Sequence, residues 1–422
     1  MINLKNEKSF CILPWKHSFV NLGGEHQVCC TSEEFNNNIR NEKGDILNIK
    51  DNLSQEQIMN SSYMKNIRRE MLNGVLPDIC KRCSLTEKTG GVSRREIENS
   101  ASMDIIPRAL ETTSDDGKIV IELESADYRL ANICNLSCRM CNPRASSKWL
   151  PIYESLSKNL KTMNDSVLNL YSYKDWSKSD SLHFDFINKV KSLKRLHFGG
   201  GEPLYNKEMT KLLKYCVEQN YAKNIELSYN TNLTFLSDEI MELWKEFKNV
   251  KLLVSIDGYA DLNHYIRYPS NWGDIDKYLC LIDQSYKELN ISEVIISTTV
   301  QMNNILHLDK LFKYVEKFNF IKQEIHLVPL YFPTYLMISN LPKSLKYLAS
   351  LKLDYLEKML IEKKYSENAI NNLKQIKSTL NVFHADSFEV GFNKFLQFSI
   401  EYDSKMGLNQ KSVNPEFHTF YK

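Results

Sequence analysis

The sequence lacks any long uninterrupted apolar run, although 42% of its 422 residues are hydrophobic. A membrane-spanning helix needs about 20 consecutive apolar residues, and no segment approaches that length. The first fifteen residues, MINLKNEKSFCILPW, also lack the basic stretch and apolar core of a secretory signal. These absences predict a cytoplasmic protein with no membrane partner.

An excess of charge of either sign is missing as well. The 54 basic and 52 acidic residues leave a formal net charge of +2, which gives no general field to attract nucleic acid. Basic runs such as KNIRRE at 65–70 have no interleaved aromatic residues and indicate solvated helix faces. No internal repeat is present. We therefore expect a globular protein with a large core and no nucleic-acid partner.

Cysteine, by contrast, occurs ten times, and eight of these residues fall into two groups: five in the first hundred residues and three within 134–141. In a reducing compartment, clustered cysteines indicate metal ligands or catalytic thiols before disulfides. Cys216 and Cys280 stand alone on apolar faces of expected helices, which favours core packing for both.

The hydrophobic pattern from residue 118 onward alternates short β-branched runs with longer amphipathic segments, which predicts an α/β fold with a parallel sheet. Six such units indicate a barrel, closed or open, and an open doubly wound sheet fits the same pattern. Helices are expected near 206–219, 236–248, 273–289 and 307–318. Strands are expected at 118–124, 193–200, 224–230, 250–257, 293–300 and 323–332.

Composition divides the chain into three parts: a cysteine-rich module over 1–100, the α/β body over 118–335 and a helical extension over 336–422. Residues 86–118 turn polar and predict a linker, and residues 160–190 predict an insertion above the sheet. Two helices are expected in the extension. The first places Leu345, Leu348, Leu356 and Leu360 on one face, and the second follows Ser366 as its N-cap.

Three cysteines, Cys134, Cys138 and Cys141, follow the first expected strand with the spacing CxxxCxxC. Loops in this position bind ligands in parallel α/β folds. Three thiolates can hold three corners of a cubane iron–sulfur cluster and leave the fourth iron open for a substrate or cosubstrate. Alternatives are a zinc site completed by a distant side chain, or a ferredoxin-like cluster.

A second motif, LHFGGGEPL, stands at the end of the next expected strand. Its glycines Gly200 and Gly201 permit close backbone approach, and Glu202 offers a carboxylate to an ammonium group.

The combination of CxxxCxxC with GGE on the following strand resembles the radical S-adenosylmethionine superfamily. The resemblance implies a partial (β/α)6 TIM-like barrel in which Cys134, Cys138 and Cys141 bind a [4Fe–4S] cluster. It also implies that Gly200, Gly201 and Glu202 contact the methionine end of S-adenosylmethionine. Members usually carry an aromatic residue where this chain has Met140, and a thioether can fill that space beside the adenine.

Further segments, SYNTN at 228–232, VSIDGY at 254–259 and HYIRYP at 264–269, resemble the peptide-modifying branches of that superfamily. On this resemblance Ser228, Asn230 and Ser255 are candidates for ribose or carboxylate hydrogen bonds, and Arg267 for a contact to the methionyl carboxylate. Ser255 and Asp257 equally suit a turn.

The N-terminal cysteines suggest a second metal site. Gly23 and Gly24 predict a hairpin between Cys11 and the Cys29–Cys30 pair, and a CxxC follows at Cys80 and Cys83. Four thiolates suit either zinc or an iron–sulfur cluster.

The spacing of Cys11, a glycine and Cys29 resembles the start of SPASM and twitch domains, which implies an auxiliary [4Fe–4S] cluster, here placed before the barrel. Cys29 is the expected ligand and Cys30 the alternative. His17 and His26 are not needed as ligands.

The resemblance implies an oxidoreductase or maturase that cleaves S-adenosylmethionine reductively to a 5′-deoxyadenosyl radical, which abstracts hydrogen from a peptide or protein. The alternatives are a dehydrogenase or mutase acting on a sugar, aminocyclitol or nucleotide, and a non-catalytic iron–sulfur or zinc protein. Both enzyme hypotheses imply an external one-electron donor such as flavodoxin or ferredoxin. The sequence assigns no catalytic residue beyond the cofactor ligands.

Overall fold

The computed structural model describes residues 8–31, 37–88, 91–161, 175–381 and 388–420. None of the described helices combines the length and apolar character that a bilayer crossing requires.

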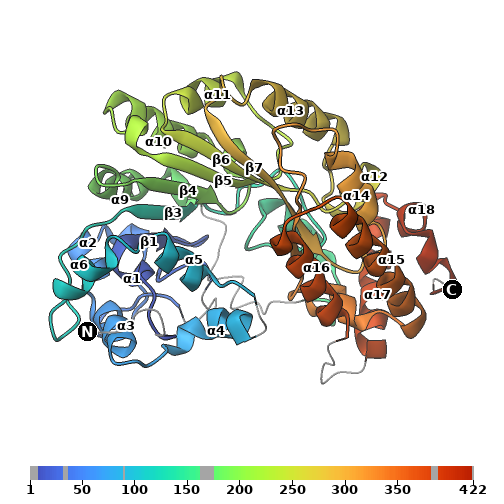
Figure 1. The fold of residues 1–422 in the computed structure, drawn as a ribbon, viewed down its shortest axis with the longest axis horizontal. Coiled ribbons are helices and arrows are strands. Elements are labelled where there is room, and N and C mark those ends of the chain that lie inside the picture. Colours follow the sequence, from blue (N-terminus) through green and yellow to red (C-terminus); the bar gives the residue numbers. More distant parts are fainter. Residues whose placement is uncertain (1–7, 32–36, 89–90, 162–174, 382–387, 421–422) are drawn as a thin grey trace.

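One mostly parallel sheet of eight strands organises the molecule (Figure 1). Its strand order is β2-β1-β3-β4-β5-β6-β7-β8, and only the β1–β2 pair is antiparallel. Strands β3 to β8 follow one another in the chain and in the sheet, as expected for a partial (β/α)6 barrel. The strands are β1 His17–Val20, β2 His26–Gln27, β3 Ser125–Arg129, β4 Arg195–Gly199, β5 Glu226–Thr231, β6 Asn249–Ser255, β7 Ile291–Val300 and β8 His326–Pro329.

The first barrel strand differs from the prediction. Residues 118–124 were expected to form it, but they belong to no strand, and β3 begins at Ser125. Ser125 is the first residue with strand partners on both sides, His17 in β1 and Arg195 in β4. Pairing, and not the apolar pattern of 118–124, therefore determines where this strand starts.

The N-terminal segment contributes strands to the same sheet. The predicted hairpin forms, with β1 and β2 antiparallel through Phe19–Gln27 and Val20–His26. Strand β1 then pairs in parallel with β3. The cysteine-rich segment is therefore joined to the barrel by backbone hydrogen bonds.

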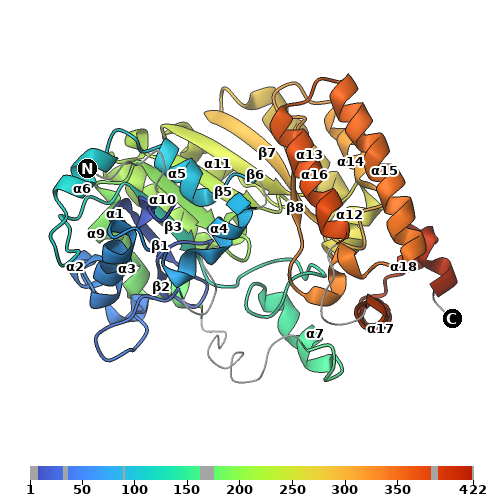
Figure 2. The ribbon, with the colours of Figure 1, turned by 60° about the horizontal axis from the view of Figure 1, so that its bottom comes forward.

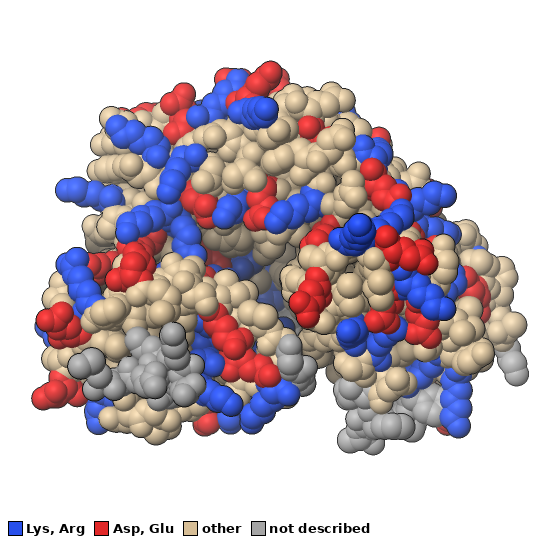
Figure 3. All heavy atoms as spheres, in the orientation of Figure 1, with Lys and Arg blue, Asp and Glu red and all other residues tan. Residues whose placement is uncertain are grey.

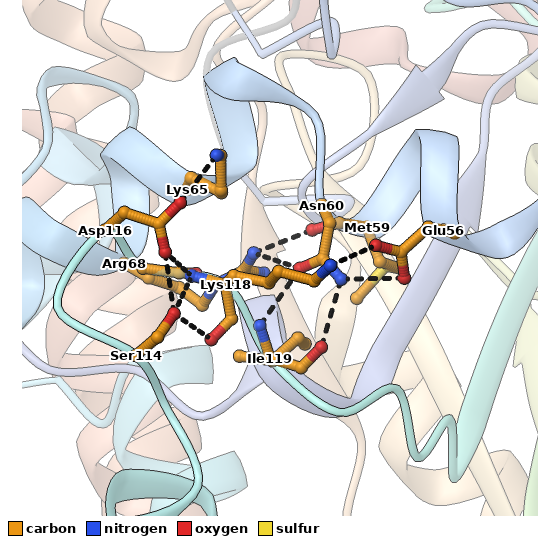
Figure 4. A network of polar contacts seen from close by, with 10 residues as sticks. Glu56, Met59, Asn60, Lys65, Arg68, Ser114, Asp116, Lys118 and Ile119 are labelled. Carbon is orange, nitrogen blue, oxygen red and sulfur yellow. Dashed lines mark hydrogen bonds and ion pairs between the residues drawn. The ribbon is translucent and has the colours of Figure 1, made fainter.

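The expected linker at 86–118 contains the helices α5 (Arg94–Ser100) and α6 (Ile106–Glu111), so the linker prediction is wrong for much of its length. Its end is held by the fully buried Arg68 of α3 (Ser62–Leu72). The Arg68 guanidinium donates to the carbonyls of Gly117 at 2.7 Å and Pro14 at 2.9 Å. It also donates to the Met59 carbonyl at 2.7 Å (Figure 4). This network connects the N-terminal module with the approach to β3.

Helices α9, α10, α11 and α13 lie along one side of the sheet, and the N-terminal and C-terminal helices lie at opposite ends of its other side (Figure 1). Part of the predicted insertion at 160–190 is the crossover helix α9, and 162–174 lie outside the described residues. The remaining helices are α1 Leu13–Lys16, α2 Gln55–Met59, α4 Lys81–Lys88, α7 Leu150–Ser155, α9 Asp180–Val190, α10 Lys207–Glu218, α11 Asp238–Lys245, α12 Asp261–Ile266, α13 Trp272–Ser285, α14 Leu308–Val315, α15 Lys343–Glu362, α16 Glu367–Leu380, α17 Phe388–Met406 and α18 Gln410–Val413.

The C-terminal extension contains both predicted helices. Leu345, Leu356 and Leu360 of α15 are buried, and the Ser366 hydroxyl accepts the Ala369 N–H at the start of α16. Helix α16 packs against β8 (Figure 2). A third long helix, α17, was not predicted, although its buried aromatic residues recur at helical spacing: Phe392, Phe395, Phe398 and Tyr402.

Residues alternate strictly between the two faces of the central strands. In β5, Leu227 and Tyr229 are buried against the covering helices, whereas Ser228 and Asn230 are half-buried on the inner face. Seen as in Figure 3, the surface is hollowed at its centre, and Lys and Arg side chains reach into the hollow. The inner face is therefore accessible.

Candidate functional site

The three-cysteine loop follows β3 directly and carries its thiols close together. Cys134 and Cys138 are 9% and 8% exposed and pack with Leu136, Met140 and Cys141. The Cys141 N–H donates to the Cys138 carbonyl at 2.8 Å, which closes a turn between the second and third cysteines. Met140 also contacts an apolar group on α12, so it lies between this loop and that helix.

Burial makes these thiols poor acids in the protein alone. It raises the pKa of Cys134 to about 12 and raises the pKa of Cys138 and Cys141 above the ordinary value, while Arg267 lowers that of Cys138. A metal bound here has to displace the thiol protons. Among the described residues, no three His, Cys, Asp or Glu side chains are closed around a single metal position.

The GGE segment is attached to the cysteine loop through its backbone. The Glu202 N–H donates to the Ile133 carbonyl at 2.8 Å, next to Cys134. Gly201, with φ of +41°, approaches the same carbonyl so closely that a Cβ would lie 2.1 Å from its oxygen. Only glycine allows this approach, which sets the GGE segment against the three cysteines.

Glu202 is a buried carboxylate, 2% exposed, at the end of the sheet. It accepts hydrogen bonds from the Thr231 hydroxyl at 2.6 Å, the Asn232 N–H at 2.7 Å and the Leu204 N–H at 3.1 Å. Burial nevertheless raises its pKa to about 7, because these donors offset only part of the lost hydration. A cationic ligand beside Glu202 would favour the ionised form.

Glu202 makes the stability of the ligand-free protein depend on pH. Its ordinary pKa is 4.5, and the folded value is about 7, so the folded state binds more protons between these values. The contribution of Glu202 to stability is then fully present below pH 4.5, and roughly 3 kcal/mol of it is lost as the pH rises through 7. We expect Glu202→Gln to lose this fall, measured by urea unfolding at pH 5 and pH 8.

Thr231→Val is the matched variant, because it removes one hydrogen bond to the Glu202 carboxylate. The fall in stability should then extend to higher pH. Equal pH dependence in the parent and Glu202→Gln proteins would contradict the assignment.

Arg267 lies beside the second cysteine. Its Nε forms an ion pair with Asp257 Oδ2 at 2.7 Å, and its Nη1 is 4.0 Å from Cys138 Sγ. Asp257 is fully buried and also accepts the Thr299 N–H at 2.7 Å. The two residues therefore form a buried ion pair next to the cysteine loop.

The remaining predicted cofactor residues lie on the inner face of the sheet. Ser228 is in register with His197 of β4, and its hydroxyl forms a hydrogen bond with His197 Nδ1 at 2.8 Å. Asn230 and Ser255 are half-buried on the same face, two and four residues further along the strand direction than the Ser228 position. In-register pairing continues this layer through Asp127, His197, Ser228 and Lys251. Asp127 and His197 were not predicted. The alternate polar position of His197 in the expected strand at 193–200 could have indicated it, whereas Asp127 lies outside the expected first strand.

The N-terminal cysteines that the sequence suggests as ligands lie around one cavity. Cys11, Cys29, Cys80 and Cys83 line one cavity, together with Arg94 and Arg95. Burial raises the pKa of Cys80 to about 12 and that of Cys11 well above its ordinary value, and the neighbouring cysteines add to both shifts.

The two adjacent cysteines point to different surroundings. Cys30 is not part of the cavity lining, and its sulfur instead accepts from Arg94 Nη1 at 3.3 Å. The two lone cysteines lie on covering helices as expected, with Cys216 fully buried in α10 and Cys280 half-buried in α13.

A sequence profile described as the radical SAM superfamily matches residues 128–300. The matched segment includes the three-cysteine loop, the GGE segment and strands β4 to β7.

The chain is also similar to individual proteins. An uncharacterized protein of Methanocaldococcus jannaschii is 28% identical over 196 residues, which cover 45% of this chain and 57% of that protein. The solved structure of anSMEcpe with bound AdoMet has a TM-score of 0.34 at 18% identity and covers 58% and 62% of the two chains.

A third similarity is to Streptococcus suis SuiB bound to precursor peptide SuiA, with a TM-score of 0.35, 11% identity, and 71% and 64% of the two chains covered. The alignments thus span less than two thirds of the length of each of these relatives.

Proposed function

We propose that this protein is a radical SAM enzyme that reductively cleaves S-adenosylmethionine and uses the resulting 5′-deoxyadenosyl radical to abstract hydrogen from a peptide or protein. The observation that carries the proposal is the backbone contact between Glu202 and Ile133, which joins the GGE segment to the three-cysteine loop. Two motifs, separated in the sequence by α7, α9 and β4 among the described elements, thereby form one site.

In this proposal Cys134, Cys138 and Cys141 would hold the cluster, which, once reduced by an external donor, would supply the electron for cleavage of the sulfonium. Gly200 and Gly201 allow the backbone to approach the methionine end. Glu202 accepts the methionyl ammonium, for which its buried carboxylate is suited because a charge-assisted hydrogen bond is strong in a dry site.

Arg267 supports the thiolate form of Cys138 by its nearby positive charge. Its second proposed role is the contact to the methionyl carboxylate. Ser228, Asn230 and Ser255 provide polar groups for the ribose or the carboxylate, and Met140 provides an apolar contact for the adenine.

The substrate space in this proposal is the inner face of the sheet. Closed TIM barrels fill their interior with layers of branched apolar side chains. Here the corresponding layer carries Asp127, His197, Ser228 and Lys251, with a hydrogen bond between His197 and Ser228. Such a lining suits a substrate with several polar groups, as a peptide backbone has.

The cavity of Cys11, Cys29, Cys80 and Cys83 is proposed to hold an auxiliary [4Fe–4S] cluster of the SPASM or twitch type. Strand β1 brings this module beside β3, the strand that leads into the three-cysteine loop. An external one-electron donor such as flavodoxin or ferredoxin completes the proposed system.

The test uses anaerobic, cluster-reconstituted protein with dithionite and S-adenosylmethionine, offered either a deuterated peptide pool or a deuterated metabolite pool. We expect 5′-deoxyadenosine to form and to gain deuterium from the peptide pool, measured by mass spectrometry. Label from metabolites alone would favour a dehydrogenase or mutase of small molecules. Absence of 5′-deoxyadenosine in every arm would contradict radical chemistry.

A further inference from the structure

Arg139 lies inside the three-cysteine loop, between the second and third cysteines, and its side chain is fully buried. Its Nη2 donates to Asp403 of α17, 264 residues further along the chain. Its Nε donates to the Tyr265 carbonyl at 3.0 Å. The buried Nη1 has no hydrogen-bond partner among the described residues, so Asp403 is the carboxylate that balances this charge.

Aromatic rings surround the same guanidinium. Its central carbon lies 3.7 Å from the centre of the Tyr265 ring and 4.6 Å from that of Tyr402, with Phe398 at 5.8 Å. Tyr265 also donates from its hydroxyl to Asp403 at 3.2 Å. A cation held against ring faces in a dry site is well stabilised, and the planar guanidinium fits this arrangement better than an ammonium.

Helix α17 holds the loop at a second point. The Tyr402 hydroxyl donates to the carbonyl of Ser137, directly before Cys138. The indole of Trp149 donates to the Cys138 carbonyl at 2.8 Å and stacks on Phe398 of the same helix, with ring centres 6.4 Å apart. The backbone on both sides of Cys138 is thus tied to one helix.

We propose that Asp403 and Tyr402 of the C-terminal helix are positioning residues for the three-cysteine cluster, and that the Arg139–Asp403 pair balances charge beside it. The proposal rests on the cluster assignment of the proposed function. Electron transfer to a cluster adds negative charge, so an unbalanced cation nearby favours the reduced state and an unbalanced anion disfavours it.

The variants Asp403→Asn, Arg139→Gln and the double variant test this balance. They change the charge beside the loop by plus one, minus one and zero, while the Arg267–Asp257 pair stays intact. We expect the midpoint potential to rise in the first, to fall in the second and to return to the parent value in the double variant. Each single shift should reach tenfold in the reduction equilibrium, about 59 mV for one electron.

The measurement is an EPR-monitored redox titration of the whole protein, following the signal that changes when S-adenosylmethionine is added. Glu401→Gln is the matched control, because Glu401 is on the same helix but binds the Ser157 N–H at 3.1 Å and hydroxyl at 2.9 Å. Its potential should equal that of the parent. Tyr402→Phe should keep the potential and lose cluster iron faster under chelator.

Potentials equal to that of the parent in both single variants, Asp403→Asn and Arg139→Gln, would overturn the inference and leave the proposed function standing. A parent protein without a signal that responds to S-adenosylmethionine would overturn both. If Asp403→Asn does not retain its cluster, Arg139→Gln and the charge-neutral double variant still give the expected order, because neither leaves a buried cation unpaired.

Discussion

Cys138→Ala is expected to abolish reductive cleavage of S-adenosylmethionine, lowering 5′-deoxyadenosine formation by roughly a thousandfold or more, about 4 kcal/mol in activation free energy. The middle cysteine carries the largest set of supporting contacts in the loop. Arg267 lies 4.0 Å from its sulfur, and Trp149 holds its carbonyl at 2.8 Å. Without this thiolate the proposed cluster loses one of three ligands, and two do not hold it.

The measurement is anaerobic product analysis by mass spectrometry together with iron content. Cys280→Ala is the matched control, because Cys280 is a half-buried thiol on the covering helix α13. It should keep parent activity and iron. A Cys138→Ala protein that still produced 5′-deoxyadenosine would remove the basis of the proposed function.

Cys29→Ala is expected to cost the protein one auxiliary cluster, about four iron atoms per chain, whereas Cys30→Ala should keep its iron. Cys29 lines the cavity with Cys11, Cys80 and Cys83, and Cys30 instead bonds Arg94. Both variants remove one sulfur from neighbouring positions, so a general effect of cysteine removal would appear equally in both.

Iron and acid-labile sulfide analysis of reconstituted protein measures this difference, and Cys80→Ala and Cys83→Ala should repeat the Cys29→Ala result. The reverse order, with iron lost in Cys30→Ala only, would contradict the ligand set. One zinc atom per chain in place of the auxiliary iron would favour a structural zinc site.

Much of the barrel could be predicted because its signals are local. Five of the six barrel strands overlap their predicted ranges, and helices form near all four expected positions. These elements have strict alternation or clear amphipathic periodicity over their own length. The exception is the first strand: residues 118–124 have the apolar character of a strand, yet the paired register with β1 and β4 begins only at Ser125.

The candidate site was predictable where a motif is contiguous. Cys134, Cys138 and Cys141 are spaced within one loop, and Gly200 to Glu202 within one turn, so sequence spacing nearly determines their geometry. The residues that hold the three-cysteine loop against α17 could not be predicted. Arg139 and Asp403 carry ordinary charged side chains, and nothing local indicates that they meet. The arginine between the second and third cysteines and the aromatic spacing of α17 are the signals that the sequence offers, and each is weak alone.

The sequence by itself determined the α/β class, the order of the barrel units and the two cysteine groups, because periodicity and short spacings act over a few residues. Only the tertiary structure decided that β1 joins the barrel sheet, that Cys29 and not Cys30 faces the other N-terminal cysteines, and that α17 supports the three-cysteine loop. Each of these depends on contacts between distant segments. Their free energy comes from burial, hydrogen bonding and charge pairing at one point in space, which no local pattern records.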